Sequence, residues 1–132
     1  MTLASASNTN TVLFLNTFRL GHNLNLGHAS QAGDEYGDET GQMGGGVGPA
    51  RCYNGYNMQV LGWFPGQTKV ITTLNPGAIE RNSLKSLADV GTGGFVNIKI
   101  GPLYLIYNRA KGLNAGTREF QDQILEIGRA HV

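Results

Sequence analysis

Apolar residues recur every three or four positions between residues 12 and 24, a spacing that places them on one face of a helix. Thr11 stands just before this stripe, and threonine is a residue type that caps helix N-termini. The pattern therefore predicts a helix of about three turns that ends near residues 23–25. Residues 1–11 are mostly Ser, Thr, Asn and Ala, which bury little apolar surface, so we expect this stretch to be loosely ordered.

Glycine dominates the chain after this helix. Residues 33–49 contain few large apolar side chains apart from Tyr36 and Met43, which predicts a long irregular loop. Loops of this length in a compact domain are usually either functional or disordered.

The second half of the chain changes from a helical to an alternating pattern. Residues 53–63 predict a short helix that runs into Gly62, and Pro65 and Gly66 predict a turn. Three β-branched or aromatic runs follow, bounded by glycine and proline, and they predict strands at residues 69–74, 95–100 and 103–108. Because only Gly101 and Pro102 separate the last two runs, an antiparallel hairpin is expected there.

Length and charge narrow the class of protein. The 132 residues suit one domain, and a formal net charge of +1 gives no basic field that would attract nucleic acid or a membrane surface. The single cysteine, Cys52, rules out an internal disulfide, although it could pair with a cysteine elsewhere. The apolar stretch at residues 12–15 is too short for a signal peptide or a membrane span.

Candidate chemistry is concentrated in residues 18–28, FRLGHNLNLGH. Zinc peptidases of the metzincin kind use the pattern H-E-x-x-H-x-x-G-x-x-H followed by a methionine turn. On a helix the first two histidines share one face, and the glutamate directs the metal-bound water as general base. Overlaying the pattern makes His22 the second metal ligand and His28 the third.

Four successive stretches of the chain resemble the gametolysins, the cell-wall-degrading metzincin peptidases of green algae. These stretches are residues 21–30, 36–46, 51–64 and 103–124, so that the resemblance covers about residues 20–125. It implies a zinc-dependent metalloendopeptidase that acts on extracellular or cell-wall glycoproteins, and a Zn²⁺-bound water as the attacking group. It also implies that Met43, in GQMGGG, forms the methionine turn beneath the metal.

Two positions depart from the family pattern. Phe18 stands where the first zinc-ligating histidine belongs, and a phenyl ring offers no lone pair to a metal. Arg19 stands where the general-base glutamate belongs, and a guanidinium does not accept a proton. We therefore expect no catalytic residue in this chain, and weak or absent zinc binding. Asn25 replaces the helix-ending glycine, which is a milder change because asparagine tolerates the left-handed conformation.

Several alternatives remain open at this point. Asp34, Glu35 or Asp38 could replace the missing ligand. The broken motif could belong to a pseudo-peptidase that binds glycoprotein or matrix. It could also mark a damaged or mispredicted gene product, in which the family sequence begins abruptly at Leu20 after unrelated residues. Residues 127–132, IGRAHV, resemble a translated adapter and are expected to be a non-native tail.

The expected architecture is α+β: a truncated metzincin-like lower subdomain, with active-site helix and methionine-turn loop, followed by a small antiparallel β region. Residues 1–11 would form a loose N-terminus and residues 12–126 a partial peptidase domain. The implied partner is a protein or glycoprotein substrate, with no nucleic acid and no membrane. The implied location is extracellular.

Overall fold

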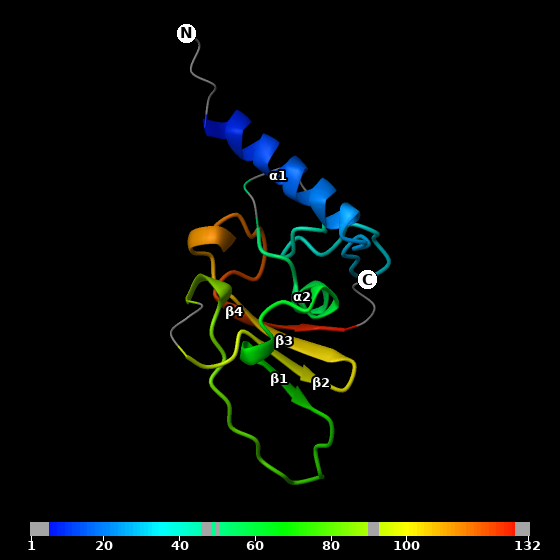
Figure 1. Ribbon diagram of the computed structural model, residues 1–132, viewed down its shortest axis with the longest axis vertical. Coiled ribbons are helices and arrows are strands. Elements are labelled where there is room, and N and C mark those ends of the chain that lie inside the picture. The colour runs from blue at the N-terminus through cyan, green and yellow to red at the C-terminus, as the bar shows by residue number, and fades with distance from the viewer. Residues whose placement is uncertain (1–5, 46–48, 50, 90–92, 129–132) are drawn as a thin grey trace.

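The computed structural model describes residues 6–45, 49, 51–89 and 93–128. Two α-helices, α1 (Ala6–Asn23) and α2 (Gly55–Leu61), come before the strands of a four-stranded sheet in the described chain. Figure 1 shows α1 lying obliquely at one end of the molecule, with α2 between it and the sheet. The long segment after the first strand extends from the opposite side. Among the described residues, no helix is long and apolar enough to cross a membrane.

Helix α1 is longer than the sequence predicted. It begins at Ala6 rather than at Thr11, so that Thr11 lies inside the helix instead of capping it; residues 1–5 lie outside the described chain. Its end was predicted correctly, because the helix stops at Asn23 and Asn25 adopts a left-handed φ of 65°. The amide nitrogens of Leu24 and Leu26 then bond to carbonyl oxygens of the last turn.

The predicted irregular loop is confirmed, since the described part of residues 24–54 contains no helix and no strand longer than an isolated bridge. Buried polar contacts order it instead. Asp38 accepts hydrogen bonds from the backbone nitrogen and hydroxyl of Thr40 and from Asn54 Nδ2. Arg51 donates to the carbonyl oxygens of Glu39 and Gly45, which ties the later part of the loop to its middle.

Helix α2 matches its prediction closely. The side-chain oxygen of Asn54 accepts a hydrogen bond from Asn57 N at 2.9 Å, which caps the N-terminus. Gly62 ends the helix with a left-handed φ of 67°, the conformation in which glycine is least strained. The predicted turn at Pro65 and Gly66 is the 3₁₀ helix η1 (Pro65–Gln67).

The sheet contains the three predicted strands and one that the sequence pattern did not reveal. The strands are β1 (Thr68–Ile71), β2 (Asn97–Ile100), β3 (Leu103–Asn108) and β4 (Gln123–Ile127), in that spatial order. The β2–β3 hairpin is antiparallel, as predicted. The expectation of a wholly antiparallel region was wrong, because β1 pairs with β2 in parallel. Ile127, the first residue of the expected tail, is buried at the end of β4, and residues 129–132 lie outside the described chain.

The core lies between the α1–loop layer and the sheet. One buried cluster contains Leu26, Ala29, Met43, Tyr53 and Met58, and Phe18 of α1 and Ile106 of β3 pack against it. Helix α2 approaches the sheet closely at Gly55, where an added Cβ would lie 2.9 Å from Ile106 Cγ2 and from Asn97 Oδ1. This core fixes the C-terminal end of α1 over the glycine loop.

Candidate functional site

The two candidate metal ligands lie side by side. His22 is on the last turn of α1 and His28 on the loop that follows, and the left-handed turn at Asn25 directs the chain back toward the helix. Their ring centroids are 4.9 Å apart, with the ring planes at 77°. The chain thus brings together the two imidazoles that the spacing of the motif had paired.

Each imidazole uses one nitrogen for a contact within the protein. His22 Nδ1 lies 3.0 Å from the carbonyl oxygen of Leu26, and His28 Nδ1 bonds to Glu35 Oε1. Because a carbonyl or a carboxylate oxygen accepts, the Nδ1 of each neutral ring carries the proton and Nε2 holds the lone pair. Metal-binding histidines are commonly oriented in this way by a second partner.

Phe18 occupies the third corner of the same group. Its ring packs edge-on against His22 at 4.7 Å between centroids and stacks on His28 at 5.8 Å with only 14° between the planes. Position 18 is therefore directed at the point where the two imidazoles meet, as the first ligand of the motif requires. It presents a hydrocarbon ring there instead of a nitrogen.

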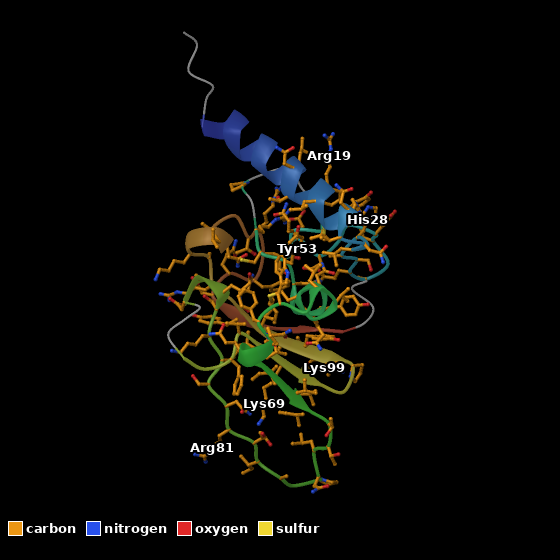
Figure 2. The ribbon with its side chains drawn as sticks, viewed as in Figure 1. Arg19, His28, Tyr53, Lys69, Arg81 and Lys99 are labelled. Atoms are coloured by element: carbon orange, nitrogen blue, oxygen red, sulfur yellow. The ribbon has the colours of Figure 1, made fainter. Side chains whose placement is uncertain are left out.

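Arg19 does not enter this group. Its side chain is exposed, and Figure 2 shows it on the outer side of α1, pointing away from the rest of the chain, with His28 near the C-terminal end of the helix. A guanidinium in that position neither accepts a proton nor reaches the paired imidazoles.

The loop carboxylates do not replace the missing ligand. Asp38 is buried among the contacts to Thr40 and Asn54, and Asp34 accepts from the backbone nitrogen of Tyr36 at 3.0 Å. Glu35 is engaged with His28 Nδ1. Within the described ranges there is no group of three or more His, Cys, Asp or Glu side chains that could hold a metal ion.

Met43 lies directly under the last turn of α1. It is fully buried, and a Cβ built on Gly21 would be only 2.3 Å from its sulfur. The carbonyl oxygen of Met43 accepts a hydrogen bond from Ala29 N at 2.8 Å, which ties the glycine loop to the residue after His28. The thioether thus supports the helix turn that carries His22.

Two contacts made by tyrosines at this site were not predicted from the sequence. Tyr36, which the pattern placed only in a loop, packs on His28 with 4.2 Å between ring centroids. Tyr53, labelled in Figure 2, donates its hydroxyl to the carbonyl oxygen of Thr17 at 2.8 Å and so holds α1 from below. Burial raises the pKa of Tyr53 above its ordinary value.

Cys52 is a free, half-buried thiol. Burial raises its pKa to about 11, so that the thiol form prevails at neutral pH. This environment does not activate a nucleophile.

The chain is a member of a metallopeptidase family. The family model described as gametolysin peptidase M11 matches residues 3–100, which are 98 of the 132 residues, so the chain belongs to the gametolysin family. The match begins well before Leu20, which corrects the expectation of an abrupt start there and places Phe18 and Arg19 within the family region. The stretch 103–124 lies beyond the match. No curated protein and no solved structure matches the chain.

The family resemblance implies a zinc ion, but the residues present do not form a complete catalytic zinc site. Catalytic zinc sites normally use three protein ligands and leave one position for water. Here two imidazole nitrogens are available, and the phenyl ring of Phe18 fills the third position. The described residues thus offer fewer ligands than such a zinc site requires.

Proposed function

We propose that this chain is a gametolysin-type metalloendopeptidase domain that has lost hydrolytic activity. Members of the type would act on extracellular or cell-wall glycoproteins through a zinc ion, and this chain would share their location but not their chemistry. The observation that carries the proposal is the ring of Phe18, which lies against both His22 and His28 at the ligand position.

Two independent losses support inactivity. Two histidines leave the metal short of a ligand, which lowers affinity, and the base that would take a proton from water is replaced by the exposed Arg19. General-base catalysis typically contributes about 10²–10⁴-fold in rate, so loss of the base alone would be severe.

The test restores both groups. A Phe18→His, Arg19→Glu double variant is expected to retain about one equivalent of zinc after dialysis and to cleave a denatured protein in a chelator-sensitive manner. Phe18→His alone is the matched control, because it restores the ligand without the base. The wild-type chain should do neither.

Either of two results would contradict the proposal. Chelator-sensitive cleavage by the wild-type chain would show that activity is intact. A well-folded double variant that takes up no zinc would show that His22 and His28 are not the remains of a metal site.

A second candidate function is a binding module for glycoprotein or matrix. It is favoured by exposed apolar side chains around the sheet, with Ile79 83% exposed and Ile124 65% exposed. Residues from all four strands and from the segment after β1 also line a hollow of about 290 Å³, among them Ile71, Leu74, Ile100, Leu105 and Ile124. Loss of binding to an immobilised glycoprotein in Ile124→Lys, with retention in the Leu20→Lys control on α1, would support this function. Equal binding by both variants would exclude it.

A further inference from the structure

A metal ion that binds ligands from two segments of a chain holds those segments together, in addition to any role in catalysis. It would tie the last turn of a helix to the loop that carries the third ligand, and in this fold that junction is irregular backbone. Few bonds of regular secondary structure hold residues 24–36 against α1. A chain with an incomplete ligand set therefore needs another contact between α1 and residues 24–36.

Four rings form a continuous contact across this junction. Phe18 and His22 belong to α1, whereas His28 and Tyr36 belong to the loop. Phe18 meets both histidines at 4.7 and 5.8 Å, the histidines meet each other at 4.9 Å, and Tyr36 meets His28 at 4.2 Å. These centroid separations are within or close to the range in which aromatic pairs attract.

The cluster is anchored at one end and open at the other. Phe18 packs against the buried cluster that includes Met43, and Tyr36 is 42% exposed. The bonds from His22 Nδ1 to the Leu26 carbonyl and from His28 Nδ1 to Glu35 fix the two imidazoles between these ends. A side chain at position 18 with no ring would leave both imidazoles without their common neighbour.

We infer that the rings of Phe18, His22, His28 and Tyr36 form a metal-independent cross-link that takes over the structural effect of the zinc ion implied by the family resemblance. Phenylalanine in place of histidine at position 18 removes a metal ligand and, at the same time, supplies the ring that packs on both imidazoles. The inference rests on the proposed loss of the zinc site, and it adds that the junction between α1 and the loop is stable without any metal. It further predicts that the residue at position 18 determines how α1 is linked to the loop. A phenylalanine links them by ring packing, whereas a histidine would link them through a metal ion.

The test compares thermal unfolding of the full chain with and without EDTA or added zinc. The wild-type midpoint should be the same in all three conditions. Phe18→Leu, which keeps an apolar side chain but no ring, should lower the midpoint by roughly 5–10 °C. Leu20→Ala, an exposed apolar truncation on the same helix, should change it far less. Phe18→His should become metal-dependent, with a midpoint that falls in EDTA and recovers with zinc.

A second readout reports the ring contacts directly. The imidazole protons of His22 and His28 should show ring-current shifts in the proton NMR spectrum, and both shifts should decrease in Phe18→Leu because Phe18 contacts both rings. If Phe18→Leu does not fold, Tyr36→Leu at the exposed end should decrease the shift of His28 and leave that of His22 unchanged, because Tyr36 contacts only His28.

The inference and the proposed function can fail separately. An unchanged midpoint and unchanged imidazole shifts in folded Phe18→Leu would overturn the cross-link while leaving inactivity intact. A wild-type midpoint that falls in EDTA would also overturn the cross-link. Chelator-sensitive cleavage by the wild-type chain would instead overturn the proposed function.

Discussion

Two regions of this chain reach an ordered structure by different means. The region from Phe18 to Gly45 has irregular backbone after Asn23 and is held by close backbone approaches, buried polar contacts and aromatic rings. The described part of residues 54–127 contains a capped helix and four strands held by regular pairing. The first region contains the candidate site and the second supports it.

The difference shows where the chain tolerates change. A strand distributes its stability over many equivalent hydrogen bonds, whereas the loop depends on a few positions where no side chain fits. Substitutions at the close approaches of the first region should therefore cost more than changes at exposed positions of the second, such as Ile124. The predictions that follow test this contrast.

The largest effect is expected at Gly44, in the turn after Met43. A Cβ there would lie 1.6 Å from the carbonyl oxygen of Asp38, and a backbone atom does not move aside easily. Gly44→Ala should lower the free energy of unfolding by more than about 3 kcal/mol in urea denaturation. Gly27→Ala is the matched control, since nothing lies within 4 Å of its Cβ position. Equal stability of the two variants would refute the close packing of this loop.

Gly21 should show the next largest effect. A Cβ there would meet the sulfur of buried Met43 at 2.3 Å and Tyr53 Cε1 at 3.2 Å, which costs about 1–3 kcal/mol. The higher helix propensity of alanine offsets up to about 1 kcal/mol of this. A double-mutant cycle with Met43→Ala sharpens the result, because Gly21→Ala should be less harmful once the thioether is gone. Simple additivity would argue against the contact.

Asn54 connects the two regions and should have an intermediate effect. It caps α2 through Asn57 N and donates to Asp38 Oδ2 at 3.1 Å in the loop. Asn54→Ala should cost about 1–2 kcal/mol in chemical denaturation. Asn54→Asp should retain the cap but place two carboxylates together, so its stability should rise as pH falls toward protonation of the pair. Absence of that pH dependence would exclude the Asp38 contact.

The smallest effect is expected at Asp89 in the supporting region. The hydrogen bond from Arg109 Nη1 at 2.7 Å holds the pKa of Asp89 below its ordinary value of 3.8. A lowered folded-state pKa stabilises the fold above the unfolded pKa, and the contribution is lost as pH falls through the folded value. Asp89→Asn should thus be slightly less stable at pH 7, and the difference should shrink below about pH 4. A difference that persists at pH 2 would require another cause.

Local residue chemistry allowed much of the supporting region to be predicted. The glycine at position 62 and the hairpin at Gly101 and Pro102 were both placed correctly, because a left-handed cap and a tight reversal depend on neighbouring residues. Strand β4 was missed since QILEI lies at the sheet edge and is largely exposed, so it lacks a clear alternating pattern. Parallel pairing of β1 was also missed, because the partner is distant in sequence.

For the site, the sequence determined the spacing of His22 and His28, the absence of a nitrogen at position 18 and the left-handed turn at Asn25, since each follows from residue type and local geometry. Tertiary structure alone decided that Tyr36 covers His28, that Glu35 engages its Nδ1 and that Gly21 rests on Met43. These contacts join side chains on a loop without periodicity, where only the packed core fixes which residues meet.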